Sequence, residues 1–208
     1  MPQPTGRIES SEPNSVGAAW IFTHWSSEKE KRDTPGGIAT SLAYYPHLNT
    51  LREYFGRPVD VIAVSKEASP PPVRSRSGPK DYLITLRLVD PSLVPERQQG
   101  IATRIFRPDE HALPKVYRGD VVVLHDFQVQ NRRREISLSS TNTSAWAVFR
   151  KGRLEGDISG PPLEYGAGES ALARILFDWW IQIDHRQPPA GAVVPHYEEN
   201  IETTEGTD

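Results

Sequence analysis

Arginine is the residue type with the clearest chemical potential in this sequence of 208 residues. Residues 57–153 hold 17 Lys and Arg against 10 Asp and Glu, whereas the flanking segments hold 7 against 17. Guanidinium groups pair with phosphates and stack on flat rings, and phosphate contacts supply most of the sequence-independent affinity of nucleic-acid-binding proteins. A basic middle between acidic ends therefore indicates a nucleic-acid partner, although an arginine-rich solvated surface would give the same count.

Catalytic and metal chemistry find little support in the sequence. The chain has no cysteine, which excludes disulfides, thiolate metal sites and cysteine nucleophiles. Asp90, Asp120 and Asp126 have turn and strand contexts without a supporting set of His and Glu residues. The histidines are scattered, and His125 is more simply explained as a structural residue. We expect no enzyme, no metal site, no cofactor and no small-molecule substrate.

The distribution of apolar residues argues against a membrane protein. The mean hydropathy is -0.54, and no run approaches the roughly 18 apolar residues of a membrane span. The first residues lack the charged-then-apolar order of a signal peptide. We expect an intracellular protein.

Short β-rich runs must position the basic residues. Within the run at 82–90, the apolar residues at 84, 86 and 88 share one face, while Thr85 and Arg87 share the other. Arg104 alternates with apolar neighbours in the same way. Further strands are expected at 59–64, 101–106, 121–130 and 135–149. Five strands with unequal connections predict an all-β fold, a five-stranded Greek-key OB-fold barrel, because an immunoglobulin-like sandwich would need about seven.

Helical segments are expected around this barrel. Leu48, Leu51, Tyr54 and Phe55 have the spacing of one face of a short helix or turn. Residues 112–117 form a helical or turn segment that can plug the bottom of the barrel. A C-terminal helix over about 171–185 has apolar residues at steps of three and four: Leu172, Ile175, Leu176, Trp179 and Ile183.

These patterns divide the chain into three parts. Residues 1–37 are expected to be a flexible N-terminal segment with one apolar cluster, Trp20–Trp25. Residues 38–187 form a single OB-fold domain with its C-terminal helix. Residues 188–208 follow two prolines and form an acidic, disordered tail or linker.

Several short motifs follow one another in an order that we know from one family. They are Leu48-Asn49-Thr50-Leu51, Asp81-Tyr82, Leu88-Val89-Asp90-Pro91-Ser92, Ile105-Phe106, Leu113-Pro114, Gly119-Asp120-Val121, and His125 with Gln130. In this order the chain resembles the single-stranded-DNA-binding domain of the protection-of-telomeres family, over roughly residues 44–186. The resemblance implies a nuclear protein that binds the G-rich telomeric overhang and protects chromosome ends with other telomere-capping proteins, the shelterin components.

The resemblance also implies a DNA-binding groove across the second and third strands. It places Phe106 where the family stacks a base and Gln130 where the family contacts a base edge. Strand alternation alone does not distinguish this position from one in the barrel core for Phe106. The residues expected to contact DNA are Lys66, Arg74, Arg76, Lys80, Tyr82, Arg87, Arg104, Phe106, Gln130, Arg132, Arg133 and Arg134.

The sequence departs from the family pattern at two stacking positions. Glu67-Ala68 stands where the family has aromatic residues, and a family tyrosine is replaced within Asn131–Arg134. Arginine planes can partly compensate, whereas Glu67 repels phosphate. An alternative function is therefore a protein-interaction module in a telomere-capping or replication-protein complex. The Trp20–Trp25 cluster or the helix at 171–183 would then contact the partner.

Overall fold

The computed structural model describes residues 36–76, 81–93, 99–132, 134–151, 153, 155–158 and 160–184. Its strands are β1 (Gly37–Ala39), β2 (Tyr44–Pro46), β3 (Pro58–Ser65), β4 (Val73–Arg74), β5 (Tyr82–Val89), β6 (Ile101–Arg107), β7 (Val121–Arg132), β8 (Glu135–Phe149) and β9 (Gly156–Asp157). Its helical elements are η1 (Leu48–Tyr54), η2 (Pro91–Leu93), η3 (Glu110–Ala112) and α2 (Ala167–Asp184). The Trp20–Trp25 cluster and the acidic tail lie outside the described residues, whereas residues 36 and 37 belong to the β1–β2 region.

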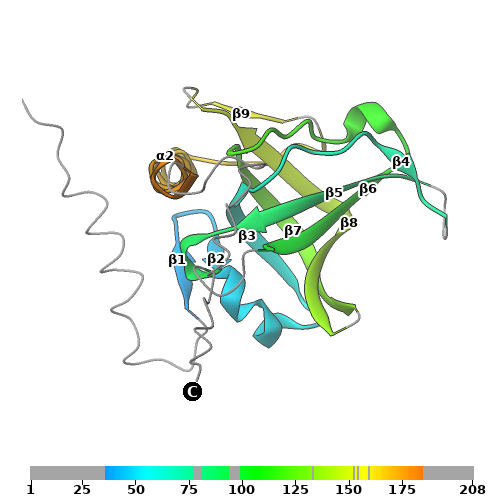
Figure 1. The fold of residues 1–208 in the computed structure, drawn as a ribbon, viewed down its shortest axis with the longest axis horizontal. Helices are drawn as coiled ribbons and strands as arrows, with labels where there is room; N and C mark the ends of the chain where they lie inside the picture. The colour runs from blue at the N-terminus through cyan, green and yellow to red at the C-terminus, as the bar shows by residue number, and fades with distance from the viewer. Residues whose placement is uncertain are drawn as a thin grey trace, which may run out of the picture.

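Five strands close into a barrel (Figure 1). The order around the ring is β3, β7, β8, β6 and β5, and the pairing of β5 with β3 closes it. Every neighbouring pair is antiparallel except β6 and β8, which run parallel. This is the strand order of an OB fold, so the predicted fold and its five strands are confirmed. The short strands β1, β2, β4 and β9 were not predicted.

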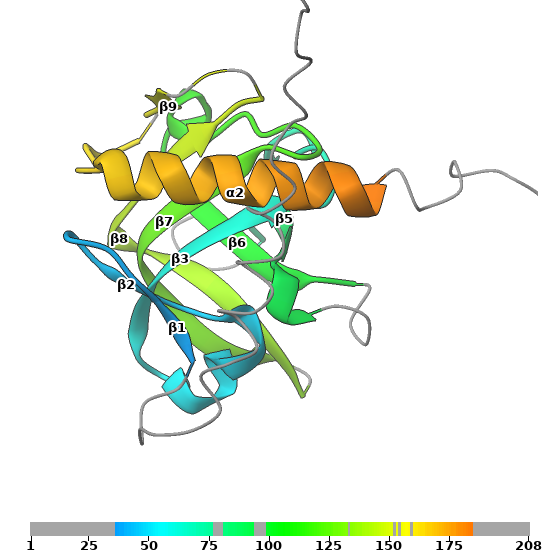
Figure 2. The ribbon, with the colours of Figure 1, turned by 90° about the vertical axis from the view of Figure 1, so that its left-hand side faces the viewer.

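Three barrel strands, β3, β7 and β8, are buried on both faces over the part of their length that α2 covers. Their inward side chains fill the barrel core, among them Val61, Leu124 and Trp146. Their outward side chains pack in a second core with α2, which lies across the barrel in Figure 2. The sequences of such strands are continuous apolar runs. Strands β5 and β6 have one buried face over most of their length, so their sequences alternate between apolar and polar residues.

The helical lead-in η1 closes one end of the barrel. Leu48 and Leu51 are fully buried, and Tyr54 packs against the core, as the sequence predicts. The prediction is wrong for Phe55, which is 61% exposed. In a 3₁₀ helix, side chains three residues apart lie above one another, and Phe55 leaves the helix with a ψ of 129°. Leu113 and Val116 are also in the barrel core, as the predicted plug requires.

Helix α2 is fixed at its start by Glu169. The Glu169 carboxylate accepts hydrogen bonds from Gly166 N at 2.8 Å, Thr40 Oγ1 at 2.5 Å and Tyr45 Oη at 3.2 Å. Burial alone would raise the pKa of Glu169, but these hydrogen bonds hold it below its ordinary value. One carboxylate thus caps the helix and ties it to the β1–β2 region. In the described ranges, no helix is long and apolar enough to cross a membrane.

Asp90 connects the end of β5 to η1. Its Oδ2 accepts a hydrogen bond from Leu48 N at 2.9 Å, and its Oδ1 accepts from Ser92 N at 3.0 Å and Ser92 Oγ at 2.6 Å. Ser92 Oγ in turn accepts from Asn49 N at 3.2 Å. The sequence motifs at residues 48–51 and 88–92 are therefore joined by hydrogen bonds.

We predict that Asp90 makes stability depend on pH. Burial raises the pKa of Asp90 to about 6 from 3.8. Because the folded state binds this proton more tightly, the stabilising contribution is complete below about pH 3.8 and is lost as the pH rises through about 6. Urea unfolding from pH 3.5 to 7 should show a difference between wild type and Asp90→Asn that changes by on the order of 2–3 kcal/mol. The exposed-site control Asp178→Asn should show no such change, and identical pH profiles for wild type and Asp90→Asn would contradict the prediction.

Candidate nucleic-acid interface

Polar side chains form two rows across the barrel strands that α2 leaves uncovered. Strand pairing aligns Thr85 with Arg104, Arg104 with Ser139, and Ser139 with Gln128. The adjacent row consists of Arg87, Ala102, Ser137 and Gln130. Both rows alternate with core residues, so they face away from the barrel interior. We call this surface the outer face; it comprises these eight residues together with Phe106.

Phe106 lies on the outer face beside these rows. It is half-buried, pairs with Leu83 across β5, and lies between the buried residues Ile105 and Arg107. Its backbone N–H donates to Ser140 Oγ at 2.9 Å, which fixes the strand at this point. The structure therefore resolves the alternative left by the sequence, because the ring does not belong to the barrel core.

Arg104 on the outer face has a second positive charge, Arg132, as its neighbour. Burial and, to a smaller extent, the positive charge of Arg132 lower the pKa of Arg104. Arg104 Nη2 donates to Ser137 Oγ at 3.4 Å, a long hydrogen bond. A phosphate between the two guanidinium groups would relieve their mutual repulsion.

Lys66 continues this surface beyond β3. Its backbone N–H donates to Arg87 O at 2.8 Å, which extends the β3–β5 pairing by one residue. Lys66 and Arg87 therefore occupy paired positions on the same side of the sheet. Glu67 and Ala68, which follow, are exposed at the border of the outer face.

Arg74 and Tyr82 form a separate pair at the end of the barrel. The guanidinium carbon of Arg74 lies 3.9 Å from the centre of the Tyr82 ring, and Nη2 donates to Tyr82 Oη at 3.1 Å. Tyr82 shares the strand face of Ile84 and packs against the barrel core. These two predicted contacts are therefore not brought together with Phe106 on the outer face.

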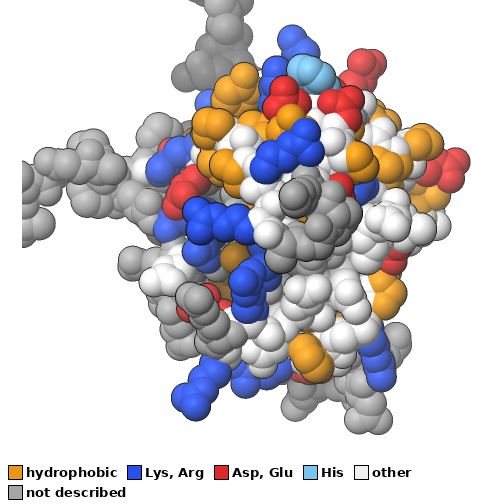
Figure 3. Space-filling view, turned by 90° about the vertical axis from the view of Figure 1, so that its right-hand side faces the viewer, with side chains coloured by type: hydrophobic (Ala, Val, Ile, Leu, Met, Phe, Trp, Pro, Cys, Tyr) orange, Lys and Arg blue, Asp and Glu red, His pale blue; other side chains and the backbone are white. Residues whose placement is uncertain are grey.

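The remaining predicted residues lie near loops. Arg132 and Arg134 are exposed at the end of the β7–β8 hairpin, and Arg134 has a left-handed φ of 69°. Arg76 is exposed beyond β4. Lys80 and Arg133 lie outside the described residues. In Figure 3, which views the molecule from the β4 side, Lys and Arg side chains gather in one region of the surface.

Sequence reasoning missed Gln128, Ser137 and Ser139, which the pairing places next to Arg104 and Gln130. Alternation with Phe127, Val129 and Leu138 could have identified them. It also missed Arg107, which points inward and lies 4.4 Å from the Trp146 ring. Arg107 donates to Phe106 O at 2.8 Å and Thr141 O at 3.1 Å, and also to Ser144 O.

His125 is held by one close contact with a carboxylate rather than by a cluster of ligands. Its Nδ1 lies 2.8 Å from Asp60 Oδ1. In the described part of the chain, no three His, Asp or Glu side chains gather in a way that could hold a metal ion. The outer face instead combines an aromatic ring with guanidinium and amide groups, and this combination suits a linear polymer that carries flat rings and negative charges.

Comparisons with known proteins point in the same direction. The family model described as telomeric single-stranded DNA binding POT1/CDC13 matches residues 40–189. A crystal structure of a Pot1 (protection of telomere) complex with single-stranded DNA is similar, with a TM-score of 0.63, 17% identity, and coverage of 79% of this chain and 96% of that chain. A crystal structure of fission yeast Pot1 and single-stranded DNA has a TM-score of 0.62 and 17% identity, and the match covers 79% of this chain and 53% of that chain. No curated protein matches the sequence significantly.

The placement of Phe106 and Ile105 on opposite faces of β6 predicts that their replacement by Ala lowers stability by different amounts. Ile105→Ala removes a fully buried side chain and should lower the unfolding free energy by about 2–5 kcal/mol. Phe106→Ala removes a half-exposed ring outside the core and should cost less than about 1.5 kcal/mol. Chemical denaturation of both variants measures the difference. Equal losses would show that the Phe106 ring has a core role.

Proposed function

The chain belongs to the telomeric single-stranded-DNA-binding POT1/CDC13 family, and we propose that its outer face binds single-stranded, G-rich telomeric DNA. The observation that carries the proposal is the alignment of Arg104, Ser139 and Gln128 in one row beside the outward ring of Phe106. This arrangement combines a stacking platform, cationic groups and hydrogen-bonding side chains, which are the requirements of single-strand recognition.

Each group has a distinct task in this proposal. The Phe106 ring stacks on a base, which typically contributes about 1–3 kcal/mol. Arg104 and Arg132 contact phosphates, and binding relieves the repulsion between them. Gln128 and Gln130 present amides that can read base edges, because the bases of a single strand are not paired. Lys66 and Arg87 extend the positive surface toward the loop after β3.

This function places the protein in the nucleus, at the telomeric ends of chromosomes. Other telomere-capping proteins, the shelterin components, are its expected partners there. The DNA-binding role of the remaining predicted residues, Arg74, Arg76, Lys80, Tyr82, Arg133 and Arg134, belongs to the same proposal. Of these, Arg74 and Tyr82 would contact DNA only beyond the end of the outer face.

Fluorescence anisotropy with a labelled G-rich telomeric single strand tests the proposal. Wild type should bind well below micromolar concentrations at low salt, and Phe106→Ala should weaken binding about 5- to 100-fold because it removes one stacking platform. Phe55→Ala is a matched control, since Phe55 is an exposed phenylalanine just after η1 and away from the outer face. His125→Ala should also have a smaller effect than Phe106→Ala.

The charged groups allow an independent check in the same titration. Replacing Arg104 and Arg132 with Gln should reduce the slope of log affinity against log salt, because fewer counterions are released. Absence of binding to any single strand at low salt would refute the proposal. Equal losses for Phe106→Ala and Phe55→Ala would refute the assignment of the stacking residue.

A second candidate function, in protein interaction, is favoured by the exposed positions of Glu67 and Ala68. These side chains offer no stacking surface where the family pattern has aromatic residues, and Glu67 repels phosphate. In this version the Trp20–Trp25 cluster would contact a telomere-capping partner.

Deleting residues 1–35 tests this second function without disturbing β1. If the function is correct, the deletion should abolish co-precipitation of telomere-capping proteins while leaving the affinity for single-stranded DNA unchanged. Substituting Trp20 and Trp25 with Ser should reproduce the loss. Unchanged co-precipitation would exclude a role for this segment.

A further inference from the structure

A cleft with a different chemistry lies on the other side of β7. Its volume is about 360 Å³, and it is lined by Tyr44, Pro46, Tyr54, Pro58, Val59, Asp60, His125 and Asp126. One wall comes from β2, which forms a hairpin with β1, and from η1; the other wall comes from β3 and β7. We call it the hairpin cleft after the β1–β2 hairpin. None of its residues belongs to the outer face.

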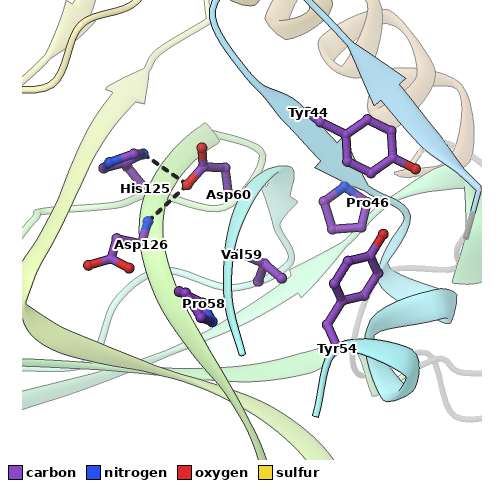
Figure 4. Close-up of a pocket in the computed structure, with 8 residues that line it drawn as sticks. All are labelled: Tyr44, Pro46, Tyr54, Pro58, Val59, Asp60, His125 and Asp126. Carbon is purple, nitrogen blue, oxygen red and sulfur yellow. Dashed lines mark hydrogen bonds and ion pairs between the residues drawn. The ribbon is translucent and has the colours of Figure 1, made fainter. Parts of the chain in front are cut away.

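One wall of the hairpin cleft consists of flat, largely apolar surfaces. Figure 4 shows Tyr44, Pro46 and Tyr54 along this wall, with Pro58 and Val59 between the two walls. Tyr44 is 37% exposed, and Tyr54 is half-buried against the barrel core. Tyrosine offers a rigid face for packing and a hydroxyl group for hydrogen bonding.

The opposite wall is acidic. Asp60 Oδ1 accepts a hydrogen bond from Asp126 N at 2.9 Å and pairs with His125 Nδ1 at 2.8 Å. Asp126 Oδ2 accepts hydrogen bonds from the hydroxyl groups of Thr141 and Thr143. Among the described residues, neither carboxylate forms an ion pair with a lysine or arginine.

The charge of this wall disfavours DNA as the occupant. Pro58 pairs with Gln128, so the hairpin cleft begins next to the outer face. Two carboxylates would repel the phosphates of a strand that continued in this direction, whereas they would attract a cation. The outer face has arginines from β6 and β7, whereas the hairpin cleft has aspartates from β3 and β7. This difference in charge distinguishes the two surfaces.

We propose that the hairpin cleft binds a short, extended peptide of a partner protein in which proline lies next to arginine. Extended proline-rich segments dock in grooves lined by aromatic residues, because they are preformed and have no internal hydrogen bonds. The prolines pack against the rings of Tyr44, Pro46 and Tyr54. The arginine reaches the Asp60 and Asp126 carboxylates. This proposal is independent of the proposed DNA binding.

Amide NMR titration of the full chain tests the proposal with the peptide acetyl-Pro-Pro-Pro-Arg-amide, in which proline lies next to arginine. Peptide addition should shift the resonances of Tyr44, Tyr54, Asp60 and His125. Asp60→Asn should weaken binding about three- to fivefold, as expected for a solvent-accessible ion pair with the arginine of the peptide, and Tyr44→Ser should weaken it further. Asp178→Asn, an exposed acidic position on α2, is the matched control and should have no effect.

A peptide with Gln in place of Arg makes the test specific. The Gln peptide should bind wild type three- to fivefold more weakly than the Arg peptide does. Its affinity for Asp60→Asn should equal its affinity for wild type, because the two changes remove the same contact.

No shift at millimolar peptide would overturn the proposal. It would also be overturned if an oligothymidine strand, rather than the peptide, shifted the cleft resonances. The affinity for telomeric DNA should be unchanged in Asp60→Asn and Tyr44→Ser, so this test and the DNA test can fail separately.

Discussion

Burial of both faces of β3, β7 and β8 determines where everything else in this domain can lie. One face of these strands fills the barrel, and the other is covered by α2, so little outward surface remains at that end of the barrel. Ligands must therefore use the outward side of β5 and β6 with the adjoining parts of β7 and β8, or the parts of β3 and β7 beside η1, which the helix does not reach. The outer face and the hairpin cleft are those two regions. Their opposite charges are a consequence of which residues the strand alternation leaves exposed there.

The sequence predicted the parts of the fold that have long periodic patterns. The alternation of β5 and β6 and the apolar runs of β3, β7 and β8 were sufficient for the five barrel strands and for the outward position of Arg87 and Arg104. Strands β1, β4 and β9 have two or three residues each, which is too short for any period to appear. The position of Phe55 was wrong because a 3₁₀ helix and an α-helix place a residue at i+4 differently.

The positions of candidate site residues were predictable where they follow from strand alternation, and not where they depend on tertiary contacts. Phe106 and Gln130 lie on one face, as the resemblance to the family implied. The stacking of Arg74 on Tyr82 and the inward position of Arg107 have no signature in the sequence, because each requires a partner distant in the chain or a barrel end. The junction of Asp90 with Leu48 gives a structural reason for two motifs that the sequence left unexplained.

The position of α2 at the C-terminal end of the domain has a consequence for synthesis on the ribosome. All five barrel strands leave the ribosomal tunnel before the helix does, because they precede it in the chain. Until then, an apolar surface that includes Val64, Val121, Val123 and Phe149 stays open to solvent and to other nascent chains. Folding during translation therefore ends only when Trp179 and Trp180 emerge and cover this surface, and a ribosome that stalls earlier would leave a chain prone to aggregation.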